Sequence, residues 1–272
     1  IDRTGHSASE YPFRCPHKDG DSFVQWQNLG LHNQVWKTTD GLAWQQVTIS
    51  GTQPPVRRDA TLVHWRSNEI DFLLLFGGEG MGGTPLGDTW LLNLNTLTWT
   101  QLTPAASPSP RVAAPAVYAS HANQVWLFGG RRIAPDVWTF DGSNWSNMLD
   151  VSAASTLWGG KTGMENLYEP SAVYQPDRQR AFLVGSDYWG GSAAGRGMEW
   201  DGTQYRLLDW SPDNNSDGKR EEFAAMGMAA VAWLGDANTG KILAMGDFAG
   251  QNITYGVEPS GTLVTPTATE TP

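Results

Sequence analysis

The sequence is poor in several residue types, and each shortage narrows what the protein can be. Its single cysteine, Cys15, leaves it without an intramolecular disulfide or a multi-cysteine zinc site. Charged residues make up only 17% of the 272, and the 28 acidic residues outnumber the 18 basic ones. Because nucleic-acid binding requires a basic surface, a net charge of −10 argues against a nucleic-acid partner. The apolar runs are too short to cross a bilayer, so we expect no membrane-spanning helix.

What the chain has in quantity is glycine, proline and tryptophan, with 31, 16 and 14 residues respectively. Glycine and proline end regular structure and favour tight turns, whereas large rings favour pleated strands. This composition predicts an all-β fold of many short strands. The length allows one such domain, because barrels and propellers can use a chain of this size as a single unit.

A turn motif recurs four times, with an Asp or Asn followed four residues later by an aromatic ring. The four copies are Asp40 to Trp44, Asn95 to Trp99, Asp141 to Trp145, and Asp201 to Tyr205. A stretch rich in strand-forming residues lies on each side of every copy. Glycine follows the aspartate in three of them and tolerates the positive φ of a hairpin turn. The motif therefore predicts four β-hairpins at a period of about 50 residues, which is typical of repeat folds.

Two further markers precede these hairpins. Apolar runs end in Gly-Gly at 73–78 and 125–130, and weaker copies lie at 181–185 and 242–246. Arginine opens the segments at Arg3, Arg58 and Arg111, which we expect to be equivalent positions in successive repeats. Together with the hairpins, these markers resemble kelch repeats, especially those of bacterial surface proteins related to the galactose oxidase central domain.

The resemblance to kelch repeats implies a β-propeller of four-stranded blades, with about five blades in this chain. We assign the propeller to residues 1–258 and a Thr/Pro-rich linker or stalk to residues 259–272. We expect the hairpin rings Trp44, Trp99, Trp145 and Tyr205 to pack between blades. The recurrence of these rings favours a core role over sugar binding.

One loop carries a pattern for metal binding. The segment 213–218 fits the calcium-loop pattern D-x-[DN]-x-[DN]-G, with oxygen ligands at Asp213, Asn215 and Asp217. Position twelve of an EF-hand loop is Ala224 here, so Glu222, or else Glu221, would have to supply the last ligand. The alternative is a solvated turn. We expect calcium to be the cofactor if there is one.

Aromatic rings in glycine-rich loops form a second candidate site. Trp158, Tyr188 and Trp189 lie outside the periodic positions, and loops on a rigid scaffold often carry function. They could bind a ligand such as a glycan, or they could only cover a blade edge. The corresponding loop of the second repeat, 79–83, has no ring, and its glycines predict a flexible segment.

The Thr/Pro tract after Val264 resembles a stalk that tethers an exported domain, so we expect an extracellular or cell-surface location. We expect a non-catalytic module that binds a protein or a glycan. One alternative is a carbohydrate-active enzyme similar to galactose oxidase or to sialidases, although the sequence assigns no catalytic residue. The other is a structural module of a surface assembly.

Overall fold

The computed structural model describes residues 33–40, 42–131, 133–150, 167–187, 196–208, 227–234, 241–248, 251–257 and 263–264. Regular structure in these ranges consists of β-strands and one short 3-10 turn, Met81–Gly83. None of the described ranges holds a helix long and apolar enough to cross a membrane. The chain divides into two compact units. The first is Ile1–Thr103 with Ser109–Val112, and the second is Pro104–Pro108 with Ala113–Pro272.

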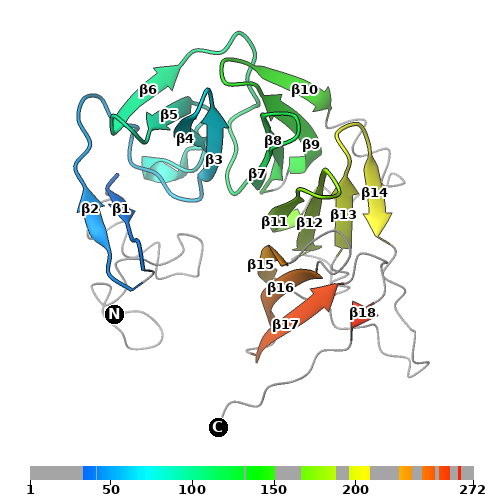
Figure 1. Ribbon diagram of the computed structural model, residues 1–272. Coiled ribbons are helices and arrows are strands. Elements are labelled where there is room, and N and C mark those ends of the chain that lie inside the picture. The colour runs from blue at the N-terminus through cyan, green and yellow to red at the C-terminus, as the bar shows by residue number, and fades with distance from the viewer. Residues whose placement is uncertain are drawn as a thin grey trace. The chain divides into compact units, whose positions relative to one another are not determined.

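The first unit contains a two-stranded hairpin and a four-stranded antiparallel meander (Figure 1). Their strands are β1 (Val35–Lys37), β2 (Gln45–Val47), β3 (Thr61–Ser67), β4 (Ile70–Phe76), β5 (Thr89–Asn93) and β6 (Thr98–Leu102). Leu74, Phe76 and Leu92 are completely buried in the meander. The apolar run that the sequence predicts to be a buried strand is therefore β4.

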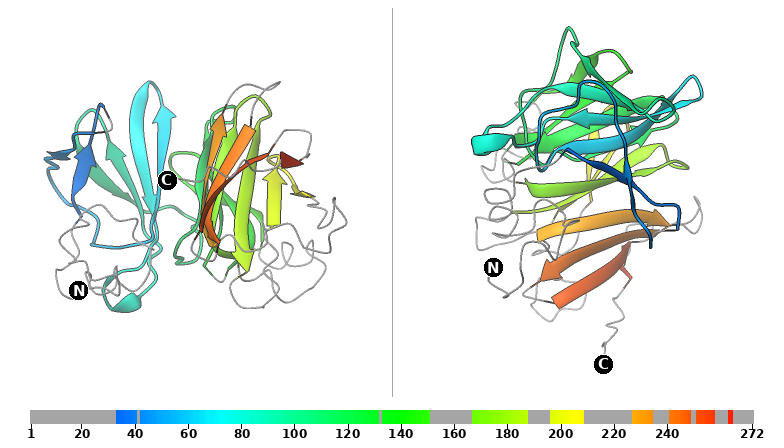
Figure 2. Two further views of the ribbon diagram at one scale, coloured as in Figure 1. Left: turned by 90° about the horizontal axis from the view of Figure 1, so that it is seen from below. Right: turned by 90° about the vertical axis from the view of Figure 1, so that its left-hand side faces the viewer.

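The second unit contains three four-stranded meanders, which stack face to face in chain order (Figure 2). The first consists of β7 (Ala116–Ala119), β8 (Gln124–Gly130), β9 (Ile133–Phe140) and β10 (Trp145–Leu149). The second consists of β11 (Leu167–Gln175), β12 (Arg180–Asp187), β13 (Arg196–Trp200) and β14 (Tyr205–Leu208). The third consists of β15 (Gly227–Leu234), β16 (Lys241–Phe248), β17 (Gln251–Val257) and β18 (Leu263–Val264). β18 lies within the range 259–272 that the sequence assigned to the stalk.

Apolar side chains of neighbouring sheets form one core in the second unit. Trp126, Phe128 and Val137 of the first sheet pack with Leu183 and Trp200 of the second. Small side chains at Ala119 and Ala181 belong to the same cluster and are completely buried. The all-β fold of four-stranded antiparallel sheets agrees with the blades that the sequence predicts.

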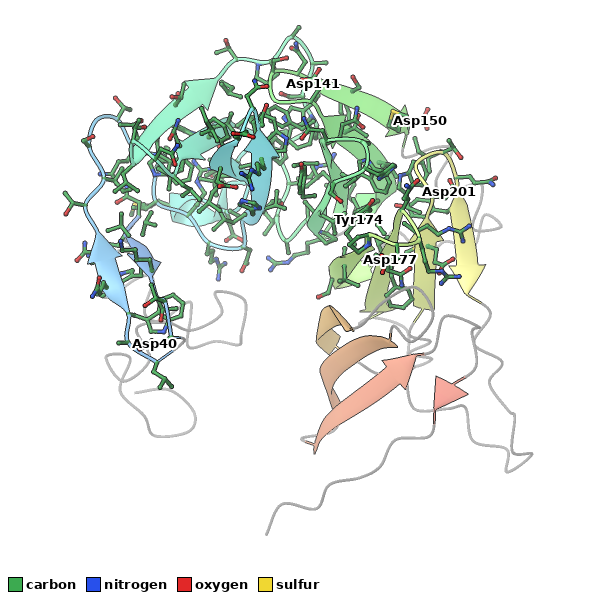
Figure 3. The ribbon with its side chains drawn as sticks, in the orientation of Figure 1. Asp40, Asp141, Asp150, Tyr174, Asp177 and Asp201 are labelled. Atoms are coloured by element: carbon green, nitrogen blue, oxygen red, sulfur yellow. The ribbon has the colours of Figure 1, made fainter. Side chains whose placement is uncertain are left out.

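The recurrent turn motif forms hairpins because its first side chain caps the turn. Oδ1 of Asp141 accepts hydrogen bonds from the amides of Ser143 and Asn144, at 2.8 Å each. Asp40 and Asp201 make the same pair of bonds in their own turns, and Figure 3 labels all three aspartates. A carboxylate held this way replaces two amide–water bonds and fixes the turn.

The second hairpin differs from the predicted form. Its turn is capped by Asn93, whose Oδ1 accepts hydrogen bonds from the amides of Asn95 and Thr96 at 2.9 and 3.0 Å. The predicted opening residue, Asn95, is therefore a donor within the turn. The turn has four residues between the paired residues Asn93 and Thr98, as the Asp141 and Asp201 turns have between theirs, but its cap comes from the paired strand residue itself.

Only some of the hairpin rings are buried as we expected. Trp145 is 2% exposed, and Tyr205 contacts Phe128 of the preceding sheet with ring centroids 6.4 Å apart. Trp99 is half-buried. Trp44 is 50% exposed, so the prediction that it packs between blades is wrong.

The structure shows a different correspondence between the arginine-led segments from the one that the sequence predicted. The backbone turns into the left-handed region at Asp59 and at Ala113, with φ of 51° and 53°. Each of these residues lies two positions after an arginine, which is Arg57 in one segment and Arg111 in the other. Arg57, and not Arg58, therefore corresponds to Arg111.

Candidate functional site

The site residues predicted from sequence lie outside the described residues. This holds for the ring set Trp158, Tyr188 and Trp189, and for the calcium set Asp213, Asn215, Asp217 and Glu222. In the described part of the chain, no group of three or more His, Cys, Asp or Glu residues could hold a metal ion. Both sets therefore stay predictions.

The described residues contain one loop whose burial changes abruptly along its length. We call residues 77–88, which connect β4 to β5, the diglycine loop. The residues at its start, from Gly77 to Gly80, are buried, whereas Met81 to Pro85 are all exposed. Met81 is 68% exposed and is one of six exposed large hydrophobic residues in the described part of the chain. The loop thus has a buried base and an exposed tip.

Backbone hydrogen bonds hold the base between two segments that are distant in sequence. The amide of Gly78 donates to the carbonyl of Arg111 at 2.8 Å, and the amide of Glu79 donates to the carbonyl of Arg58 at 2.8 Å. A β-carbon on Gly78 would lie 2.7 Å from the Arg58 carbonyl oxygen. Glycine is required here because the chains approach more closely than any side chain allows.

A buried ion pair closes the far end of the loop. The guanidinium of Arg57 binds both carboxylate oxygens of Asp88, at 2.6 and 2.7 Å, and also donates to the carbonyl of Gly77 at 2.8 Å. The indole of Trp90 donates to the same carboxylate at 2.6 Å. Burial alone would raise the pKa of Asp88, but these hydrogen bonds and the Arg57 charge outweigh it and lower that pKa below its ordinary value.

A second ion pair reinforces the start of the loop. Arg58 donates to Oε1 of Glu79 at 2.6 Å, and both side chains are mostly buried. The charged groups at the base therefore bind one another. Paired in this way they stabilise a fixed loop geometry, and they are not arranged as an acid and a base facing a substrate.

The tip closes on itself in a compact turn. The amide of Gly80 donates to the carbonyl of Thr84 at 2.9 Å, and Gly82 and Gly83 have φ of 78° and 80°. The expectation that residues 79–83 form a flexible segment does not hold at Glu79, which is bonded to Arg58 through both its amide and its side chain. The arrangement presents Met81 on a preorganised turn, which suits recognition.

The sequence contains a signal for the Asp88 site that the repeat analysis missed. In two places an aspartate lies two residues before a strand tryptophan and accepts a hydrogen bond from its indole. Trp90 donates to Asp88 at 2.6 Å, and Trp138 donates to Asp136 at 2.9 Å. Gln34 and Trp36 form a weaker copy at 3.3 Å. The Asp-x-Trp spacing marks the third strand of two of the sheets, β5 and β9, and would have located the carboxylate.

These repeats define the class of protein. The KLHDC2/KLHL20/DRC7 Kelch-repeats domain family matches residues 25–168, which is more than half of the chain. The chain therefore belongs to the kelch-repeat family.

Curated relatives match over parts of their length. The chain is 33% identical to dynein regulatory complex subunit 7 of Chlamydomonas reinhardtii over 132 residues, which is 48% of this chain and 11% of that protein. It is 39% identical over 61 residues to the host cell factor homolog hcf-1 of Caenorhabditis elegans, covering 22% and 8% of the two chains. It is 31% identical over 113 residues to the F-box/kelch-repeat protein At1g51550 of Arabidopsis thaliana, covering 38% and 23%. The chain thus spans less than a quarter of each relative.

A solved structure shares the fold. It is described as "Cryo-EM structure of RAG in complex with one melted RSS and one unmelted RSS", and its chain aligns with a TM-score of 0.53. The alignment covers 86% of this chain and 73% of that chain at 11% sequence identity. At this identity the likeness concerns the fold alone.

Proposed function

We propose that this chain is a non-catalytic kelch-repeat module that binds a partner protein through the exposed tip of the diglycine loop. The observation that carries the proposal is the contrast between the buried base and the exposed Met81. Methionine is a flexible apolar side chain that adapts to varied protein surfaces. A loop that is already ordered loses little conformational entropy on binding, which favours affinity.

The relatives support a role in protein assembly. One of them is named as a subunit of a dynein regulatory complex, and another as an F-box/kelch-repeat protein. Neither name identifies a partner for this chain. The partner surface that fits the tip is an apolar pocket with a polar rim, because the residues beside Met81 are glycines and Thr84.

Site-specific photo-crosslinking tests the proposal. A photoreactive amino acid is placed at Met81 in one variant and at Met148 in a matched control, since Met148 is another exposed methionine, 47% exposed on β10. Both variants are irradiated in an extract of the source organism. We expect a discrete protein adduct from position 81 that is absent from position 148. No adduct at position 81, or the same adducts at both positions, would contradict the proposal.

Three further parts of the proposal rest on the sequence alone. They are an extracellular or cell-surface location with tethering through the Thr/Pro tract, glycan binding at Trp158, Tyr188 and Trp189, and calcium binding at Asp213, Asn215, Asp217 and Glu222. A calcium titration of the wild type and of Asp213→Ala tests the last of these. Binding of one ion that the variant loses would support the calcium loop, and equal binding by both proteins would refute it.

A further inference from the structure

Exposed aromatic rings gather on the β1–β2 hairpin of the first unit. Six large hydrophobic residues are exposed in the described ranges, and three of them lie on this hairpin, namely Trp36, Leu42 and Trp44. Trp36 is the middle residue of β1 and is 37% exposed, whereas Trp44 directly precedes β2 and is 50% exposed. Leu42 lies in the turn between the strands.

The corresponding rings of other sheets are covered. The indoles of Trp36 and Trp90 each donate a hydrogen bond to a side chain two residues earlier, so these two residues correspond. Trp44 and Trp145 each follow a turn that is capped by an aspartate four residues earlier. Trp90 is 3% exposed and Trp145 is 2% exposed. Rings that are core residues in those sheets are therefore surface residues on this hairpin.

The register of the hairpin places both rings on one face. Trp36 lies opposite Gln46, and Trp44 comes two residues before Gln46. Because side chains alternate across a strand, Trp44 shares the face of Trp36, and the α-carbons of such diagonal neighbours lie about 7–8 Å apart. Val35 and Val47 pair on the opposite face, where Val47 is buried. One face of the hairpin is thus covered, and the other presents two rings to solvent.

The polar groups beside the rings are uncharged amides. Gln34 accepts the hydrogen bond from the indole of Trp36 at 3.3 Å, so its amide lies beside that ring. Gln46 places a second exposed amide on the same face. Lys37 is next to Trp36 on the strand and therefore belongs to the opposite face. Oδ1 of Asp40 caps its own turn. An amide offers two donors and an acceptor, which is what a ligand rich in hydroxyl groups requires.

We propose that the face formed by Trp36, Trp44, Gln34 and Gln46 is a binding platform for a neutral oligosaccharide. The C–H groups of a sugar ring are attracted to the negative face of an indole, and the two amides bind hydroxyl groups beside it. A neutral ligand matches four contact residues that carry no charge, whereas a charged peptide would find no opposite charge among them. The platform does not include the diglycine loop, so its failure would leave the proposed function unaffected.

Isothermal titration calorimetry with cellohexaose, xylohexaose and mannohexaose tests the platform. We expect the wild type to bind at least one of these neutral probes, and Trp36→Ala and Trp44→Ala each to bind it more weakly by about tenfold or more. The matched control is Leu42→Ala, which shortens an 88% exposed side chain of the same hairpin and should leave the affinity unchanged. Absence of binding of all three probes to the wild type, or equal affinity of the wild type and both tryptophan variants, would overturn the proposal.

Two further arms keep the test decisive. If a tryptophan variant fails to fold, Gln46→Ala removes only an exposed amide and should still weaken binding several-fold, whereas Trp44→Phe retains a stacking ring and should bind nearly as the wild type does. Wild-type affinity of Gln46→Ala together with loss of binding by Trp44→Phe would contradict the platform. Hexagalacturonate is the charged probe, and it should bind more weakly than the best neutral probe. Equal or tighter binding of hexagalacturonate would overturn the assignment to neutral sugars.

Discussion

The carbonyl oxygen of Arg111 lies 2.6 Å from the position that a β-carbon on Gly77 would occupy. The carbonyl of Leu86 lies 3.1 Å from the same position, and Gly77 has φ of 64°. At Gly77 the diglycine loop therefore passes between two backbone segments that leave no room for a side chain. This close approach is the reason that the loop base is fixed while its tip projects into solvent.

The first prediction compares two glycines of this loop. Gly77→Ala should lower the free energy of unfolding by about 3 kcal/mol, because the new methyl group meets backbone that cannot move freely. Gly82→Ala should cost only about 1 kcal/mol, because Gly82 has a positive φ but no heavy atom lies within 4 Å of its added β-carbon. Urea unfolding of both variants measures the difference. Equal losses of unfolding free energy would contradict the conclusion that backbone atoms crowd Gly77.

The second prediction concerns the pH dependence of the Arg57–Asp88 pair. The pKa of Asp88 in the folded protein is lowered from its ordinary value of 3.8. Its ionised form therefore stabilises the protein at neutral pH, and this contribution is lost as the pH falls below 3.8 and through the folded-state pKa. Asp88→Asn should cost about 3 kcal/mol at pH 7, because it leaves Arg57 buried without its counter-charge.

Urea unfolding at several pH values between 3 and 7 checks this account. The stability difference between the wild type and Asp88→Asn should be largest at neutral pH and should shrink in acid. Asp71→Asn is the control, because Asp71 is 38% exposed and its pair with His64 lies at the surface. A difference for Asp88→Asn that does not change with pH would refute the role of its charge.

The third prediction exploits strain at Ala113. Its φ of 53° lies in the left-handed region, where a β-carbon is unfavourable. Ala113→Gly should therefore raise the free energy of unfolding by up to about 1 kcal/mol despite the added chain entropy. Ala119→Gly, in a completely buried strand position, should instead lower it. Thermal unfolding distinguishes the two, and a destabilised Ala113→Gly variant would contradict the strained backbone.

The fourth prediction tests the hairpin caps. Asp141→Ala removes the acceptor for the amides of Ser143 and Asn144 and should cost about 1 kcal/mol. Asp141→Asn retains a side-chain oxygen there and should cost less than half as much. Chemical denaturation of both variants provides the measurement. If the two substitutions are equally costly, the charge of the carboxylate matters more than the cap geometry.

The sequence allowed the strands and hairpins to be predicted because their signals are local. Glycine after Asp141, and the apolar run of β4 that ends at Gly77, report on backbone preferences within a few residues. Pairing register is not local. Arg57 and Arg58 are adjacent, and only the left-handed residue Asp59 shows which of them corresponds to Arg111. In the same way, only the structure shows that Asn93, at the end of β5, caps the second turn in place of Asn95.

The diglycine loop could not be predicted as a site for a related reason. Its glycines suggested flexibility, but the atoms that hold Gly78 and Glu79 belong to Arg111 and Arg58, which are distant in sequence. No spacing rule places those carbonyls beside the loop. The Asp-x-Trp repeat at Asp88 and Trp90 was available in the sequence and would have identified the ion-paired end of the loop.

Hydrogen–deuterium exchange of the wild-type protein, resolved to single amides across residues 76–88, tests most directly whether a fixed base carries a projecting tip. The amides of Gly78 and Glu79 should exchange slowly because they donate to the carbonyls of Arg111 and Arg58 at 2.8 Å each. The amides of Gly82 and Thr84, at the exposed tip, should exchange faster by orders of magnitude. Uniformly fast exchange throughout the loop would show that no fixed base exists and would contradict the account of how this module presents its binding surface.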